Sequence, residues 1–176
     1  MVITDAGFSG AADLDQAMEA LGYPTKAHAV LDRSVFVPPS IVREVGTRAV
    51  VNAVRTAHYG DVERQRRTYI PPDEAETLFG LRSSVPEAFG VYVDDNATAH
   101  FAFAACFDVP KDQVSTQVCH VFPRSPHDPR LFTALPNLLL TPAWLAKLTD
   151  NDPDVPAVLR WAVRVAYNFC PRFQPG

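Results

Sequence analysis

The sequence has no excess of basic residues. Its sixteen Lys and Arg side chains are outnumbered by twenty Asp and Glu side chains, which gives a formal net charge of −4. Because contacts to phosphate are made by Lys and Arg, this balance argues against a protein that coats nucleic acid through bulk electrostatics. A local basic face is still compatible with the composition, and net charge does not decide whether the chain has a protein partner.

The sequence also has few cysteines and no long apolar run. Cys106, Cys119 and Cys170 are odd in number and show no CxxC spacing, so neither a disulfide framework nor a zinc knuckle is expected. No unbroken apolar stretch approaches the roughly 18 residues of a membrane span, and residues 1–5 lack the basic region of a signal peptide. We therefore expect a soluble, cytoplasmic protein with no membrane contact.

Glycine is scarce and proline is plentiful. Eight glycines stand against sixteen prolines, which predicts many fixed turns and short elements. A chain of 176 residues, of which 47% are hydrophobic and 20% charged, is long enough for one domain with a sizeable core. We expect a single domain over residues 1–176, with 1–10 and 171–176 as loose tails.

Apolar residues at helical spacing dominate the first half of the chain. Each stretch ends in a glycine, and together they predict helices at 13–22, 38–60 and 71–80. Arg55 lies off the apolar stripe of the second stretch and is expected on a solvated helix face. Residues 27–37 have mixed character, and the segment at 35–37 fits either a brief strand or a buried connection.

The second half mixes strand-like and helical patterns. Strands are predicted at 88–94, 97–107, 113–122 and 137–141, and helices at 142–148 and 156–169. In 97–107 bulky side chains alternate with small ones, so the small face, which carries His100, is a candidate ligand-binding surface. The predicted fold class is α+β, with a helical N-terminal half, a central antiparallel sheet of about four strands and a long C-terminal helix packed against it.

One cluster of basic residues lies in the middle of the chain. Arg64, Arg66 and Arg67 are followed closely by Tyr69. Guanidinium groups match the geometry of phosphate, and a nearby aromatic ring can stack on a base. The cluster is therefore either a phosphate-binding patch or a run of exposed charge.

The most specific pattern lies between residues 117 and 148. An extended apolar segment ends in His120-Val-Phe-Pro-Arg-Ser125, and a second short apolar run, Asn137-Leu-Leu-Leu140, leads into the predicted helix. This order of strand, loop, strand and helix resembles the ββα metal motif of HNH endonucleases. The first run resembles the family's His-hydrophobic-x-Pro-x-Ser, and the second resembles its Asn-Leu-hydrophobic-Leu.

The resemblance implies hydrolysis of phosphodiester bonds with a divalent metal, which would be Mg²⁺ or Mn²⁺ and alternatively Zn²⁺. His120 would be the base that activates water, and Asn137 would hold its geometry. Cys119 stands where the family commonly has an acidic residue or a histidine, so Cys119 is a candidate ligand, together with Asp150 and Asp152 beyond the helix. The implied partner is DNA, with candidate phosphate contacts at Arg64, Arg66, Arg67, Arg124 and Arg130.

Departures from the family motif keep a rival interpretation open. Leu145, Ala146 and Lys147 occupy the part of the helix where a third ligand is expected. His127 and Asp128 in the loop are alternative ligands. Without a working metal site, the same scaffold would be a non-catalytic interaction or ligand-binding module.

Three further alternatives involve the same side chains. Cys119 and His120 can be an ordinary buried thiol and a hydrogen-bonded histidine, with Asn137 forming a turn. Cys119 can instead be a nucleophile activated by His100 or His127. A small-molecule enzyme built around His100 is the third alternative. A protein partner or a homo-oligomer is compatible with each of them.

Overall fold

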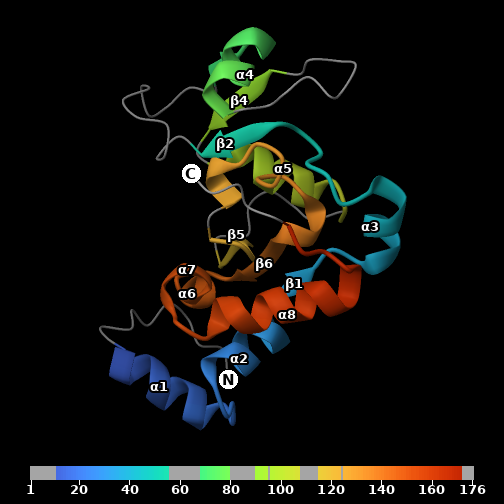
Figure 1. Ribbon diagram of the computed structural model, residues 1–176. Helices are drawn as coiled ribbons and strands as arrows, with labels where there is room; N and C mark the ends of the chain where they lie inside the picture. Colours follow the sequence, from blue (N-terminus) through green and yellow to red (C-terminus); the bar gives the residue numbers. More distant parts are fainter. Residues whose placement is uncertain are drawn as a thin grey trace.

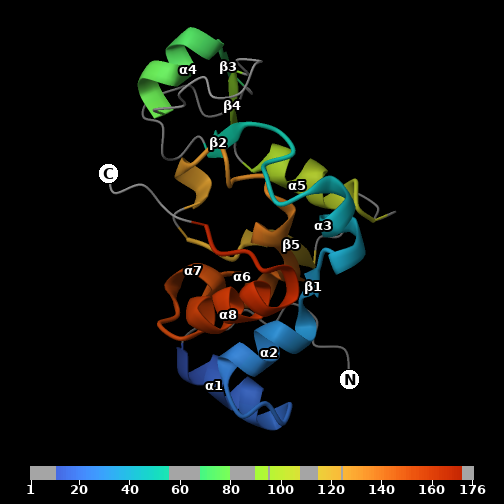
Figure 2. The ribbon, with the colours of Figure 1, turned by 45° about the vertical axis from the view of Figure 1, so that its right-hand side comes forward.

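The computed structural model describes residues 11–55, 68–79, 90–94, 96–107, 115–123 and 125–171. Its elements are stacked and include two small sheets (Figure 1, Figure 2). The N-terminal helices lie at one end of the stack, the first sheet lies in the middle among helices, and the second sheet lies at the other end. The mixture of helix and sheet agrees with the predicted α+β class.

The central sheet consists of three strands in the order β1-β6-β5, and both pairings are antiparallel. The strands are β1 (Val35–Phe36), β5 (Thr116–His120) and β6 (Leu138–Pro142). Because side chains alternate along a strand, this sheet presents two faces. Cys119 and Leu139 are Cα partners on one face, and His120 and Leu138 are Cα partners on the other.

Helices cover the face that carries Cys119 and Leu139. The helices on this side are α1 (Ala11–Ala20), α2 (Lys26–Arg33), α6 (Ala143–Ala146), α7 (Leu148–Asn151) and α8 (Val155–Tyr167). Val30, Leu145 and Leu159 from these helices join the two sheet residues in one buried apolar cluster. The C-terminal helix α8 and the central sheet therefore share one buried cluster.

The opposite face of the central sheet packs against α3 (Pro39–Val45) and α5 (Ala97–Ala104). Val42 of α3 and Phe103 of α5 join Val118 and Leu138 of the sheet in a second buried cluster. Phe132, from the loop between β5 and β6, lies in the same cluster. The central sheet is thus enclosed on both faces.

The second sheet also has three strands. Its strands β2 (Ala53–Arg55), β3 (Thr68–Ile70) and β4 (Val91–Asp94) lie in the order β2-β4-β3. β2 is parallel to β4, whereas β3 is antiparallel to it. One face of this sheet and α4 (Pro72–Phe79) share a cluster of buried residues, which are Val54, Ile70, Ala75, Val91 and Val93.

The expected single sheet of about four antiparallel strands is wrong in its layout. β5 and β6 are antiparallel neighbours near the predicted positions, but β4 belongs to the second sheet and pairs in parallel with β2. The segment at 35–37 contains a strand, β1, at the edge of the central sheet. The helices expected at 13–22, 71–80 and 156–169 are present as α1, α4 and α8, whereas α2 has no predicted counterpart.

Residues 97–104 form helix α5 rather than the expected strand. The buried residues Thr98, Ala99, Ala102 and Phe103 lie on one face of this helix, while Phe101 is 50% exposed. Alternation of large and small side chains predicts a strand, but alanine has the highest helix propensity of all residues. Helix propensity and the burial of one helical face outweigh the alternating pattern here.

The long helix expected at 38–60 ends at Val45. Gly46 has a φ of +97°, a backbone conformation that ends the helix and favours glycine. Beyond Gly46 the backbone pairs with the loop at Thr133 and Ala134, and it then continues into β2. The remainder of the predicted helix, 56–60, lies outside the described residues.

Two further expectations concern the ends of the chain and membranes. Residues 1–10 and 172–176, which cover most of the expected tails, lie outside the described residues. Among the helices that are described, none is both long enough and apolar enough to cross a bilayer.

Candidate functional site

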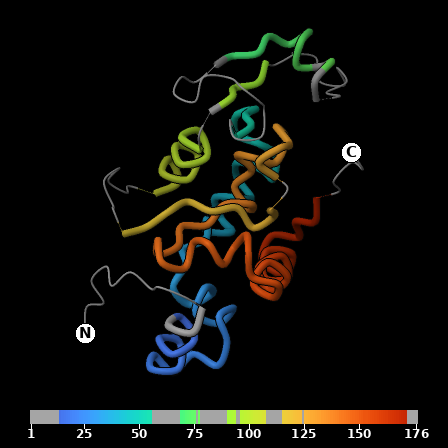
Figure 3. Tube along the Cα trace, turned by 90° about the vertical axis from the view of Figure 1, so that its left-hand side faces the viewer, coloured from blue at the N-terminus to red at the C-terminus, as the bar shows by residue number. Residues whose placement is uncertain are grey.

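β5 and β6 bring the histidine and the asparagine of the sequence motif to the same end of the central sheet. β5 ends at His120, β6 begins at Leu138, and these two residues are Cα partners. Figure 3 shows the β5 segment in yellow beside the orange β6 segment. The loop of residues 121–137 joins the two strands, and it contains two 3₁₀ turns, η2 (Ser125–His127) and η3 (Leu135–Asn137).

Asn137 ties the two ends of this loop together. Its Oδ1 accepts a hydrogen bond from the backbone N–H of Phe122 at 3.1 Å, and its Nδ2 donates to the carbonyl oxygen of Leu131 at 2.8 Å. The backbone N–H of Val121 also donates to the Asn137 carbonyl at 2.8 Å. Asn137 is fully buried, so these bonds are protected from water. One side-chain amide therefore fixes the path of the loop.

A second anchor joins the loop to the segment before β2. The Thr133 hydroxyl accepts from the Val51 N–H at 2.9 Å and donates to the Val51 carbonyl at 2.5 Å. Ala49 and Ala134 form a backbone bridge beside it. Because β2 follows Val51 closely, this anchor brings Arg55, at the end of β2, toward the loop.

His120 is enclosed on its side of the central sheet. The residue is 5% exposed, and its ring stacks on Phe132 with centroids 5.1 Å apart and an angle of 16° between the ring planes. Nε2 lies 3.0 Å from the carbonyl oxygen of Phe132. Since a carbonyl can only accept, Nε2 carries the proton of the neutral ring and Nδ1 does not.

The same enclosure keeps the His120 ring uncharged. Burial lowers the pKa of His120 to about 4, and the positive charge of Arg55 lowers it as well, while the bond to the Phe132 carbonyl acts in the opposite direction. At neutral pH the imidazole is therefore neutral. Its immediate partners are an aromatic ring and a backbone carbonyl.

Arg55 is a residue near this site that sequence reasoning missed. Arg55 does not lie on the expected solvated helix face, because it ends a strand and is partly buried. Its charge acts on His120, Cys119 and Asp150. The local sequence carries no signal of this placement, since it results from pairing between residues that are far apart along the chain.

Cys119 lies on the opposite face of the sheet from His120. Its Sγ donates to the carbonyl of Ala146 at 3.9 Å. Burial raises the pKa of the Cys119 thiol to about 11, while a side-chain hydrogen bond with Thr149 lowers it. The thiol is protonated at neutral pH, so the geometry favours neither a metal-bound thiolate nor a nucleophile activated from the side of His120.

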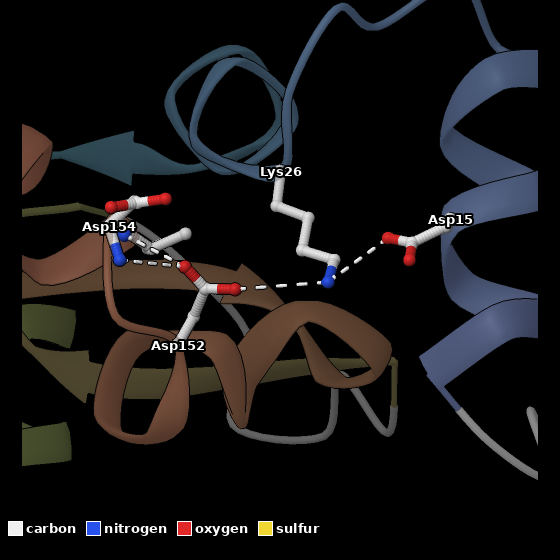
Figure 4. Close-up of polar contacts among 5 residues, drawn as sticks. Asp15, Lys26, Asp152 and Asp154 are labelled. Carbon is white, nitrogen blue, oxygen red and sulfur yellow. Dashed lines mark hydrogen bonds and ion pairs between the residues drawn. The ribbon is translucent and has the colours of Figure 1, made fainter.

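Asp152 binds groups at the start of α8 and a lysine of α2 (Figure 4). Its Oδ1 accepts from the backbone N–H groups of Asp154 at 3.0 Å and Val155 at 3.1 Å. Its Oδ2 lies 3.9 Å from Lys26 Nζ, which is also 3.0 Å from Asp15 Oδ1. Asp152 thus connects α8 with α2, and Lys26 extends this connection to α1. Both carboxylate oxygens of Asp152 have partners.

The described residues do not fit the divalent ion that the HNH resemblance implies. No three His, Cys, Asp or Glu side chains among them come together as a metal site. Cys119 faces away from His120, and Asp152 is bound to Lys26 and α8. Asp150 lies at the end of α7 and is exposed as a residue. Partial desolvation of its carboxyl nevertheless raises the pKa of Asp150, while the charge of Arg55 lowers it.

The loop residues considered as alternative ligands are also engaged or exposed. Asp128 accepts two bonds from the Arg130 guanidinium, at 2.8 Å from Nε and 2.6 Å from Nη2, and a third from the Arg130 backbone N–H at 2.9 Å. This carboxylate raises the pKa of Arg130. His127 is exposed. Arg130 is therefore partly neutralised as a phosphate contact.

The remaining candidates lie elsewhere or cannot be placed. His100 is partly buried within α5, so the small-residue strand face proposed around it does not exist. The other four candidate phosphate contacts lie outside the described residues, and they are Arg64, Arg66, Arg67 and Arg124. Comparison of the chain with models of protein families, with curated proteins and with solved structures finds no match.

Proposed function

We propose that the chain is a diverged HNH-like module that acts by binding a partner rather than by metal-dependent cleavage. The observation that carries this proposal is the enclosure of His120, which is 5% exposed and stacked on Phe132. A general base must reach the water that it activates. The protonated Nε2 already bonds to the Phe132 carbonyl, and among the described residues no carboxylate shifts the pKa of His120.

The hydrogen bonds of Asn137 support the same proposal. The amide holds Phe122 and Leu131 in place, so hydrogen bonds of the protein itself fix the path of the loop. The motif residues then act as a structural framework. A rigid loop between two strands is also suited to presenting neighbouring surfaces to a partner, because little conformational entropy is lost on binding.

The test is a calorimetric titration of the full chain with Mn²⁺, Mg²⁺ and Zn²⁺, together with a plasmid-nicking assay. A binding module gives no stoichiometric heat, no metal-dependent rise in melting temperature and no nicking. Nicking that requires a metal and is lost in His120→Gln, while His28→Gln retains it, would overturn the proposal. His28 is a matched control because it is an exposed histidine on α2.

A second candidate function is hydrolysis of phosphodiester bonds with His120 as the base. The specific observation in its favour is the tautomer of the ring, because a neutral imidazole with its proton on Nε2 leaves Nδ1 able to accept a proton. Arg55 is near enough to act on the ring, and a guanidinium can hold a phosphate.

The two candidates differ in the response of nicking to arginine substitutions. Hydrolysis at this site predicts that Arg55→Gln reduces nicking strongly, whereas Arg130→Gln, whose guanidinium is bound to Asp128, has a smaller effect. Nicking that is equal in both variants would remove this second candidate. Circular dichroism of each variant separates loss of the site from loss of the fold.

A further inference from the structure

The outer side of α8 carries an exposed surface that no element of the described chain covers. Trp161 and Val165 are 65% and 66% exposed, and Arg160 and Arg164 are also exposed. Figures 1 and 2 show α8 along the outside of the molecule. The other side of the helix is buried through residues such as Leu159, which fixes the orientation of the exposed side.

The four exposed side chains form two parallel stripes. Arg160 and Arg164 are one helical turn apart, and so are Trp161 and Val165. At about 100° per residue, the two arginines lie on one flank of the exposed side, and the tryptophan and the valine lie next to them. We refer to these four residues as the α8 surface. It combines an apolar stripe with a basic one.

The basic stripe has no acidic partner within the described chain. α8 itself contains no Asp or Glu, and the ion pairs of the described residues do not include Arg160 or Arg164. Two like charges one turn apart destabilise a helix slightly. Tryptophan and arginine are also the residue types most enriched in the energetic centre of protein interfaces. Contacts within the described chain therefore do not account for these four exposed side chains.

Charge and symmetry decide which occupant fits. Nucleic acid would complement the arginines, but it gives no role to Val165, and the chain has a net charge of −4. A second copy paired about a two-fold axis through this surface would place arginines against arginines. An acidic amphipathic helix complements both stripes, because its apolar ridge covers Trp161 and Val165 while its carboxylates meet the two arginines.

We propose that the α8 surface docks an acidic amphipathic helix of a partner protein. This inference rests on the proposed binding function and specifies the chemistry of the partner. Trp161 is the central apolar contact, and Arg160 and Arg164 select for acidic residues beside the apolar ridge of the incoming helix. Because the surface is separate from His120, its test does not depend on nicking or on metal binding.

The test uses the full chain and two fluorescent helical peptides of about 14 residues with the same leucine ridge. One peptide carries glutamates beside the ridge, and the other carries lysines at those positions. We expect fluorescence anisotropy to show binding of the acidic peptide that is at least about tenfold tighter than that of the basic peptide and that weakens with salt. Trp161→Ala should lose about tenfold or more in affinity.

Charge reversal is the more discriminating part of the experiment. The double variant Arg160→Glu with Arg164→Glu should invert the preference between the peptides, whereas Arg43→Glu with Arg48→Glu, the same charge change at exposed positions elsewhere, should not. Equal or absent binding of the two peptides would overturn the proposal. So would tight binding of an oligothymidine of about 15 nucleotides that depends on Trp161, or self-association that Trp161→Ala abolishes.

Equal or absent binding of the two peptides, in a chain that neither binds metal nor nicks DNA, would mean that the proposed acidic helical partner is wrong. The proposed binding function would then remain. If nicking is observed and depends on His120, the proposed function is wrong whatever the peptides do. The two failures are therefore distinguishable.

Discussion

The central sheet and the second sheet differ in how much apolar structure surrounds them. The central sheet, β1-β6-β5, lies between two buried clusters that draw on helices from both ends of the chain. Among the described residues, the second sheet, β2-β4-β3, shares a cluster of five buried residues with α4 on one face, and Ala53 of β2 joins the cluster around α3 and α5 on the other. Because apolar burial supplies most of the favourable free energy of folding, the two sheets should differ in local stability.

The residues of the candidate site come from both sheets. His120 and Asn137 belong to the central sheet and its loop, and both are buried. The second sheet contributes Arg55, whose position depends on the bonds between Thr133 and Val51. A rigid part of the molecule thus holds the motif residues, and a less enclosed part brings one charge toward them.

The largest expected effect comes from removing the amide that holds the loop of the central sheet. Asn137→Ala leaves the N–H of Phe122 and the carbonyl of Leu131 buried without their side-chain partners. The Leu131 carbonyl keeps its bond from the Ala134 N–H at 3.1 Å, whereas loss of the buried bond to the Phe122 N–H costs about 1–3 kcal/mol, so the free energy of unfolding should fall by up to about 3 kcal/mol. Urea denaturation followed by circular dichroism measures this change.

Asn151→Ala is the matched control, because Asn151 is exposed at the end of α7. It should change the free energy of unfolding by less than about 0.5 kcal/mol. Similar losses in the two variants would mean that the buried amide contributes little, and the central loop would then not be the rigid part of the molecule.

The next effect is the pH dependence that His120 gives to the central sheet. Its pKa is about 4 in the folded chain, against about 6.5 when the chain is unfolded. Between these values the unfolded ring binds a proton and the folded ring does not, so stability falls as pH falls from about 6.5 to about 4. The loss approaches about 3 kcal/mol, or about 1.4 kcal/mol per pH unit.

Urea denaturation of the parent chain and of His120→Gln at several pH values isolates this contribution. The variant should be less stable at pH 7, and the difference between the two proteins should shrink as the solution becomes more acidic. His28→Gln, at an exposed position, should show the same dependence of the free energy of unfolding on pH as the parent chain. A constant difference between the parent chain and His120→Gln across the range would show that the ring is not kept neutral by burial.

A smaller and more local effect is expected in the second sheet. A Cβ added at Gly90 would lie 2.3 Å from the carbonyl oxygen of Ile70 and 2.4 Å from Cζ of the Tyr69 ring. The ring can move, but the backbone of β3 must shift, so Gly90→Ala should cost about 2 kcal/mol. Hydrogen exchange should show faster opening of β3 and β4, with β5 and β6 unaffected.

Gly46→Ala provides the contrast for this prediction. Gly46 has no atom within 4 Å of an added Cβ, but its φ of +97° is strained for alanine. It should cost about 1 kcal/mol and leave exchange in β3 and β4 unchanged. If Gly90→Ala accelerated exchange equally in both sheets, the sheets would unfold as one unit and the proposed difference in local stability would be wrong.

Local patterns were sufficient to predict the hairpin of the central sheet but not its enclosure. The apolar run before Pro123 and the run before Pro142 predict β5 and β6 near their observed positions. The stacking of Phe132 on His120 depends on the path of the loop, which no local pattern describes. Asn137 bonds to the loop backbone at Phe122 and Leu131, and its role in catalysis, which the resemblance implies, stays a prediction.

The second sheet was harder to predict because its strands are short and its pairing is not local. β2 and β4 are parallel neighbours, and parallel strands require a long connection between them. The apolar residues at 49–54 fit helical spacing equally well, and only the pairing with residues 133–134 places them in extended structure. Arg55 could not be identified as a neighbour of His120 for the same reason.

The smallest expected effect tests the helices at the end of the stack opposite the second sheet. Lys26→Met removes the ion pairs with Asp15 and Asp152 but retains most of the apolar stem (Figure 4). Partly exposed pairs contribute about 0.2–1 kcal/mol, and Asp152 keeps its bonds to α8, so the free energy of unfolding should fall by about 0.5 kcal/mol. In about 1 M salt the loss should disappear, since the Debye length is then about 3 Å. Lys147→Met, at an exposed lysine of the same chain, should show no loss at either salt concentration. A loss for Lys26→Met that persists in high salt would mean that packing, rather than charge, joins these helices to the central sheet.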